Sequence, residues 1–195
     1  KACDILLRSN AVGITLLGDK GQISQRASEL GLNLDKADII NPANSELIDE
    51  FATTLYELRK SKGMELEKAK ELIKDRTYFG TMLVYKGLAS AMVSGASTTT
   101  AQTIRPALQF IKTKPGVTSV SGSFIMCANG QIHFYADCAI MPNPSPSDLA
   151  GVAIATAATA REFGFEPKVA MLSYSTGDSG SGPSVDAIIE ATKIL

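Results

Sequence analysis

The sequence has no tryptophan, one histidine and three cysteines among its 195 residues. A single imidazole excludes mechanisms that need two, and the lack of tryptophan excludes ligand cages built from that residue. Cys3, Cys127 and Cys138 are odd in number and lack CxxC spacing, which excludes a disulfide framework and a thiol zinc knuckle. We therefore expect a protein of the reducing cytoplasm with no metal site.

Long apolar runs and an excess of charge are also missing. No run of 18 apolar residues is present, so we expect no segment to span a membrane. With 19 basic and 20 acidic residues, the chain lacks the concentrated positive charge that binding to duplex nucleic acid requires. What is present is a chain with 45% apolar residues, long enough to bury a core of its own.

The first 116 residues alternate between helical patterns and short continuous apolar runs, with Gly, Pro, Asn or Asp between them. Short apolar runs are typical of strands covered on both faces of a parallel sheet, so the pattern predicts an α/β fold. We expect strands at 13–18, 37–40 and 89–93, and helices at 22–30, 45–63, 65–74, 76–86 and around Arg105, with Ser45 capping the second helix.

The pattern changes after Pro115 and Gly116. Residues 118–140 contain two β-rich runs joined at Asn129 and Gly130, which predicts an antiparallel hairpin. A helix capped by Ser147, a buried strand at 168–173 and a last helix are expected to follow. Residues 1–116 carry 16 basic and 13 acidic side chains, against 3 and 7 in residues 117–195. We therefore predict a first α/β domain at 1–116 and a second at 117–195.

A loop rich in hydroxyl groups follows the strand expected at 89–93. Small residues and hydroxyl donors before a helix suit a phosphate site, which makes Ser94, Gly95, Ser97, Thr98 and Thr99 candidate phosphate-binding residues. A similar loop spans 174–183, and neither loop is a Walker A or GxGxxG motif. The alternative is that these are tight turns whose hydroxyls cap helices.

Arg105 lies seven residues beyond Thr98, about two helical turns away, and so could reach an anion held at that loop. Pro106 either kinks this helix or marks its true start, because proline has no backbone N–H. The alternative for Arg105 is an ordinary surface arginine.

Other candidates are weaker. His133 suits a partly buried strand position, and Cys127 and Cys138 suit small core residues. Asp137 and Asp178 could orient a nucleophile, but one distant histidine gives no basis for a Ser-His-Asp triad.

Four segments, taken together, resemble the phosphate acetyl/butyryltransferase family, the phosphotransacetylases, in their order along the chain: KGMELEKAKELIKDRTYFGTMLV, MVSGASTTTAQTIRPALQFIKTKPG, FYADCAIMPNPS and VAMLSYSTGDSGSGPSVD. The resemblance implies a three-layer α/β/α fold of two domains, similar to isocitrate dehydrogenases, with the active site between them. It also implies a homodimer that transfers acetyl reversibly between acetyl-CoA and phosphate, with CoA as a substrate and no cofactor.

The resemblance also assigns roles to residues. Arg59 of ELRKSKG and Arg105 of IRPALQ match the arginines with which the family binds CoA, and the loop from Ser94 to Thr99 would lie beside the acyl-phosphate site. Family members are longer at both ends. Because their catalytic Asp and Ser-Arg pair would lie beyond Leu195, we expect this chain to be an internal, inactive piece. A phosphate butyryltransferase, or a non-catalytic acetyl-CoA-sensing domain fused to a malic enzyme, remains the alternative.

Overall fold

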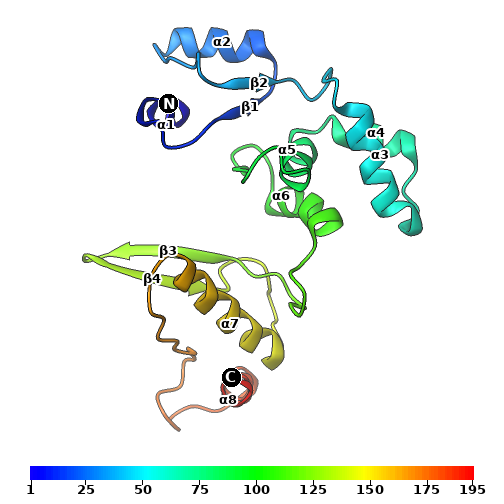
Figure 1. Cartoon of the computed structure of the whole chain (residues 1–195). Coiled ribbons are helices and arrows are strands. Elements are labelled where there is room, and N and C mark those ends of the chain that lie inside the picture. Colours follow the sequence, from blue (N-terminus) through cyan, green and yellow to red (C-terminus); the bar gives the residue numbers. More distant parts are fainter. The chain divides into compact units, whose positions relative to one another are not determined.

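The computed structural model describes all 195 residues and divides into two compact units, residues 1–112 and 113–195 (Figure 1). No helix in either unit combines the length and the apolar character needed to cross a membrane.

The first unit opens with two helices and a pair of parallel strands: α1 (Ala2–Ser9), β1 (Thr15–Leu17), α2 (Lys20–Glu29) and β2 (Asp38–Ile40). Thr15 pairs with Asp38, and Leu17 with Ile40. The predicted strands and their parallel pairing are confirmed. The expected full burial is wrong, because the first pair of the register is exposed and the remaining residues are only partly buried.

The next three helices build the core of this unit: α3 (Ile48–Arg59), extended by a 3-10 turn η1 (Lys60–Lys62), α4 (Leu66–Ile73) and α5 (Arg76–Tyr85). The rings of Phe51 and Phe79 lie 5.1 Å apart at the centre of the core. Ser45 does not cap α3 as predicted. Its hydroxyl accepts from the backbone N–H of Leu47, and the helix begins only at Ile48.

Residues 89–93 do not form the predicted strand, since they join no ladder of backbone hydrogen bonds and Val93 is fully exposed. The segment instead passes close over α5. A Cβ added to Gly80 would lie 2.7 Å from Met92 Sδ and 3.2 Å from Leu17 Cδ1. Met92 of this run therefore contacts a helix instead of filling a sheet, while Val93 points to solvent.

The last helix of the first unit is α6 (Thr100–Pro106), which continues as a π-helical turn, η2 (Ala107–Ile111). Thr99 caps α6, and its side chain forms a capping box with Gln102. Pro106 is buried and does not start the helix. It lies where α-helical bonding gives way to the π turn, which the Lys112 N–H closes on the Ala107 carbonyl at 2.9 Å.

The second unit contains a hairpin and two helices: β3 (Ser123–Ala128), β4 (Gln131–Ala136), α7 (Pro146–Glu162) and α8 (Pro183–Ile194). The hairpin turns at Asn129 and Gly130, both with positive φ, and its strands are antiparallel as predicted. Figure 1 shows α7 lying along this hairpin. Together with the parallel pair of the first unit, the hairpin confirms the mixed α/β class.

Two predictions for the second unit are wrong. Ser145, not Ser147, caps α7, because Ser145 is the residue whose hydroxyl accepts from the backbone N–H of Asp148. Residues 168–173 are not a buried strand. Leu172 is 80% exposed, and the two strands of this unit pair only with each other, so the segment has no neighbouring strand to join.

Candidate functional site

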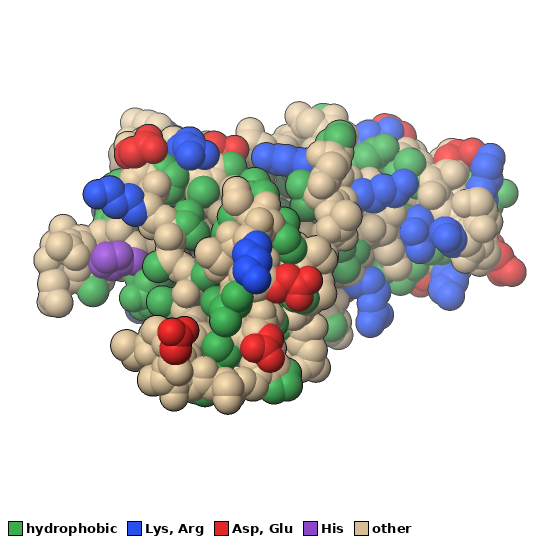
Figure 2. Space-filling view, turned by 90° about the horizontal axis from the view of Figure 1, so that it is seen from below, with side chains coloured by type: hydrophobic (Ala, Val, Ile, Leu, Met, Phe, Trp, Pro, Cys, Tyr) green, Lys and Arg blue, Asp and Glu red, His purple; other side chains and the backbone are tan.

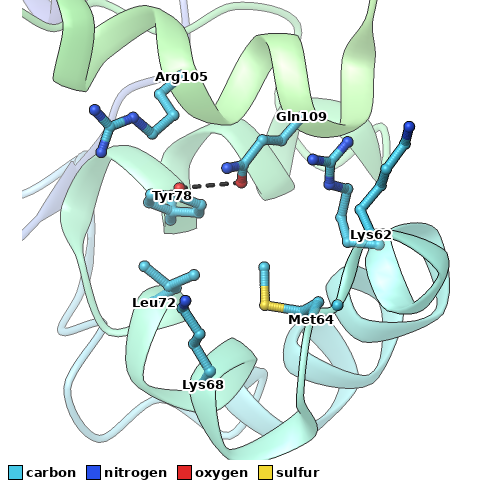
Figure 3. A pocket seen from close by; sticks show the side chains of 9 residues that line it. Lys62, Met64, Lys68, Leu72, Tyr78, Arg105 and Gln109 are labelled. Carbon is cyan, nitrogen blue, oxygen red and sulfur yellow. Dashed lines mark hydrogen bonds between the residues drawn. The ribbon is translucent and has the colours of Figure 1, made fainter.

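The first unit contains a pocket of about 280 Å³ at the junction of α3, α4, α5 and α6 (Figure 3). Its wall carries four cationic side chains and no carboxylate. The lining residues are Arg59, Lys62, Gly63, Met64, Lys68, Leu72, Tyr78, Arg105 and Gln109. Such a wall suits a ligand that carries several negative charges.

The local fold explains how the cations come together. Arg59 is the last residue of α3, and Lys62 follows in η1. The chain reverses at Gly63, whose φ of 78° is a left-handed conformation that glycine adopts readily. The Met64 N–H then donates to the Arg59 carbonyl at 3.3 Å, which leads the chain into α4 and brings Lys68 to the same pocket.

The second half of the wall comes from α6 and η2. Arg105 and Gln109 are four residues apart and line the same pocket. In Figure 3, Arg105 and Lys62 lie on opposite sides of Tyr78 and Gln109, while Met64, Lys68 and Leu72 form the other wall.

The pocket cations differ from their neighbours in having no acidic partner. Lys60, Lys70 and Lys74 on the same helices each pair with a carboxylate, those of Glu57, Asp49 and Glu71 respectively. None of the four pocket cations forms an ion pair. Lys and Arg side chains gather over this part of the first unit, around α3, η1 and α4 (Figure 2). Charge left uncompensated within the chain is available to an anionic ligand.

Arg59 also has an unsatisfied hydrogen-bond donor. Its Nε atom is buried and has no hydrogen-bond partner, the only buried side-chain nitrogen or oxygen atom in this state. A buried donor without a partner is costly, and more so when it belongs to a charged group. An acceptor from a bound ligand would satisfy it.

Tyr78 and Gln109 form a hydrogen-bonded pair in the wall. The Tyr78 hydroxyl donates to Gln109 Oε1 at 3.0 Å. Burial raises the pKa of Tyr78, and this outweighs the opposing effects of the nearby Arg105 charge and of the bond to Gln109. The phenol therefore keeps its proton around neutral pH and remains a donor.

The structure brings Arg59 and Arg105 into one pocket but does not bring the hydroxyl loop there. Ser94, Gly95 and Ser97 are exposed and do not line the pocket. The hydroxyl of Thr98 lies 2.9 Å from that of Thr103, and that of Thr99 accepts from the Gln102 N–H at 3.2 Å. The hydroxyls of Thr98 and Thr99 thus bond to residues at the start of α6. This agrees with the alternative given for the loop, in which its hydroxyls stabilise a helix start.

None of the weaker candidates lines the pocket. His133 is exposed on β4 opposite Met126, and Asp178 is exposed in the loop before α8. Asp137 accepts from the backbone N–H groups of Gly122, Ile140 and Met141, and thus ties a loop to the hairpin. The cysteines Cys3, Cys127 and Cys138 are free, and no cluster of three or more potential metal-ligating side chains is present.

The sequence pattern singles out neither Lys62 and Lys68 nor the Tyr78–Gln109 pair, all of which line the pocket. One signal was available for Gln109, which follows Arg105 at the i, i+4 spacing that places two side chains on one helix face. The role of Tyr78 had no local signal, because its partner lies 31 residues away in sequence.

Comparison with known proteins places this chain in a family. The sequence profile described as "Phosphate acetyl/butaryl transferase" matches residues 1–195. The chain is 54% identical over 195 residues to a phosphate acetyltransferase of Helicobacter pylori and 50% identical over 194 residues to one of Nitratidesulfovibrio vulgaris. Both alignments cover 100% of this chain, but only 38% and 28% of the relatives' lengths.

Two solved structures of phosphotransacetylases also match the chain. The EutD phosphotransacetylase from Staphylococcus aureus matches with a TM-score of 0.87 at 43% identity, over 99% of this chain and 58% of that one. A phosphotransacetylase from Streptococcus pyogenes matches with a TM-score of 0.89 at 42% identity, over 99% of this chain and 59% of that one. Because the family profile and these relatives all match the chain essentially from end to end, the chain belongs to the phosphate acetyl/butaryl transferase family.

Proposed function

We propose that the protein carrying this chain transfers an acetyl group reversibly between acetyl-CoA and inorganic phosphate, giving acetyl phosphate and CoA. The observation that supports this most is the pocket in which Arg59 and Arg105 face a common space with Lys62 and Lys68 and without a carboxylate. CoA carries several phosphate charges on a long chain, and a cationic pocket of this kind can hold one end of it. The names of the relatives agree with this activity.

In the direction of acetyl-CoA formation, the CoA thiol loses its proton and the sulfur attacks the carbonyl carbon of acetyl phosphate. The S–C bond forms, the C–O bond to phosphate breaks, and phosphate leaves. A thiol with a pKa near ~8.5 is only a few per cent ionised at neutral pH, so a base that takes its proton accelerates the reaction. The pocket has no carboxylate or imidazole for this step, so its residues bind CoA and the base comes from elsewhere in the protein.

We assign the phosphate group to the loop formed by Ser94, Gly95, Ser97, Thr98 and Thr99. The hydroxyls of Ser94 and Ser97 have no partner within the chain and can donate to an anion, in support of this assignment. Ser97→Ala should then raise the KM for phosphate and leave the KM for CoA unchanged. An unchanged KM for phosphate in both Ser94→Ala and Ser97→Ala would remove the loop from the site.

The arginines provide the main test. Arg59→Ala and Arg105→Ala should each raise the KM for CoA about ten- to hundredfold, because a charge-assisted hydrogen bond contributes about 1.5–3 kcal/mol. Arg105→Lys should recover only part of the loss, since an ammonium keeps the charge but not the planar pair of donors. Lys60→Ala is the matched control. Lys60 follows Arg59 directly, but it pairs with Glu57 and does not line the pocket.

Turnover is measured as CoA release from acetyl-CoA and phosphate, with butyryl-CoA as the second substrate. No release from either would refute the proposed reaction, and faster release from butyryl-CoA would change the acyl group assigned to it. We also propose a cytoplasmic homodimer that needs no cofactor. Light scattering of the purified protein would measure its mass in solution. Activity retained in EDTA, with acetyl-CoA and phosphate as the only additions, would support a reaction that needs no metal or other cofactor.

A further inference from the structure

We infer that Gln109 is a ligand-binding residue of the cationic pocket, selective for a phosphorylated group, and that Tyr78 is the positioning residue that fixes its amide. The inference rests on the proposed function in taking CoA as the ligand. It adds two neutral side chains, those of Tyr78 and Gln109, to the charged residues of the pocket.

The position of Tyr78 is fixed by its helix and by packing in the core. It lies on α5, which Asp75 caps by accepting from the backbone N–H groups of Thr77 and Tyr78 at 2.9 and 3.1 Å. The side chain is only 7% exposed, and its ring packs 6.4 Å from that of Phe110 in the core. Tyr78 also lines the pocket, and its hydroxyl donates to Gln109. A rigid, buried donor of this kind can determine the orientation of its acceptor.

The bond to Tyr78 determines which atoms of Gln109 remain free. Because Oε1 accepts the phenol proton, the amide nitrogen Nε2 is left with two N–H groups, and neither has a partner within the chain. In this orientation the amide offers its two N–H groups, and not its oxygen, to a ligand. The free donors of the wall are then two guanidinium groups, two ammonium groups and one amide NH₂.

A wall rich in free donors selects its ligand by chemistry. A phosphate group offers several acceptor oxygens and no donor at full ionisation, so it can accept from the Gln109 amide and from the cationic groups of the same wall. A carboxylate at position 109 would have the same shape but the opposite effect. It would pair with the neighbouring arginines and repel the ligand.

The test uses the binding of CoA, measured by calorimetry, alongside steady-state kinetics. Gln109→Glu should weaken CoA binding at least tenfold, because the variant replaces a donor by a negative charge without changing the size of the side chain. Tyr78→Phe should weaken it about three- to tenfold and raise the KM for CoA with little change in kcat, since only the hydroxyl that orients the amide is removed.

Coupling between the two residues distinguishes positioning from a merely structural role. In a Gln109→Met background, Tyr78→Phe should cause no further loss of CoA affinity, because the group that it positions is already gone. Tyr85→Phe is the matched control, since Tyr85 also lies on α5 and its ring packs 5.9 Å from that of Phe110, but it does not line the pocket. This control should bind CoA like the unmodified protein.

The outcomes separate the two proposals. If Gln109→Glu binds CoA as tightly as the unmodified protein, or if the effects of Tyr78→Phe and Gln109→Met simply add, the inference is wrong, whereas turnover of acetyl-CoA would still support the proposed function. If CoA binds and Gln109→Glu abolishes binding, but no acetyl group reaches phosphate, the inference stands and the proposed reaction fails.

Discussion

The two units place their large apolar side chains differently. In the first, Phe51, Leu55, Ile73, Phe79 and Met82 are fully buried in one cluster that joins three helices. In the second, the buried apolar side chains are small and belong to α7 and α8, namely Ala150, Val152, Ala153, Ala160, Val185 and Ala191. Its larger side chains remain exposed on the hairpin, including Phe124, Ile125, Met126, Ile132 and Tyr135.

This difference shows where the stability of each unit comes from. The cluster of the first unit holds the helices that carry the pocket, so the position of the pocket follows from core packing. The second unit buries fewer large apolar side chains within the chain. The ring of Phe134 contacts those of Phe163 and Phe165, at 5.9 and 5.8 Å between centroids, but Phe163 and Phe165 are themselves exposed.

The largest expected effect is on the core of the first unit. Phe79→Ala should lower the free energy of unfolding of this unit by about 3–5 kcal/mol, because it removes a fully buried ring and leaves a cavity. Val185→Ala in α8 should cost the second unit only about 1–2 kcal/mol. Urea unfolding followed by hydrogen exchange and mass spectrometry measures both units. Equal losses would contradict the proposed difference in core packing.

The next effect concerns Asp137 in the second unit. Burial raises the pKa of this carboxyl, but hydrogen bonds from the backbone of Met141, Gly122 and Ile140 outweigh it, and the net pKa is lowered. Asp137→Asn should therefore lower the free energy of unfolding at pH 7 by about 1–2 kcal/mol, the usual value for a charged acceptor reduced for its partial exposure.

The pH dependence of this effect has a definite sign. A lowered carboxyl pKa stabilises the folded state above the ordinary value for aspartate, near ~4, and this contribution is lost as the pH falls through the lowered value. The stability difference between the unmodified protein and Asp137→Asn should thus be full at pH 6–7 and shrink below about pH 4. A difference that stays constant down to about pH 2 would show that the ionised carboxylate is not the stabilising group.

The same comparison explains how far the sequence predicts the fold. Local signals were sufficient for the hairpin at Asn129 and Gly130, for most helices and for the two paired strands. They failed at 89–93 and 168–173, where apolar composition alone predicted buried strands. A strand needs a neighbour to bond with, and the composition of a segment contains no information about that neighbour.

The residues of the candidate site were likewise predicted only in part from the sequence. Arg59 and Arg105 were found from their motifs, and the structure places both at the same pocket. Lys68 and the Tyr78–Gln109 pair were not found, because their proximity depends on how α4, α5 and η2 pack. Helix caps were predicted to within a few residues, since several hydroxyls compete at each helix start and only the backbone geometry decides between them.

The smallest expected effect concerns the start of α7, where the hydroxyls of Ser145 and Ser147 are both candidates for the helix cap. The Ser145 hydroxyl accepts from the Asp148 N–H at 3.2 Å and donates to the Asp148 carboxylate, which also accepts from Ser119. Ser145→Ala should lower the free energy of unfolding of the second unit by about 1 kcal/mol, the usual cost of losing an N-cap. Ser147→Ala should cost less than about 0.5 kcal/mol, because the only partner of Ser147 is the Ser145 hydroxyl at 3.0 Å. Urea unfolding of the two variants side by side measures the difference. An equal or larger loss for Ser147→Ala would show that Ser147, the residue predicted from the sequence, caps α7.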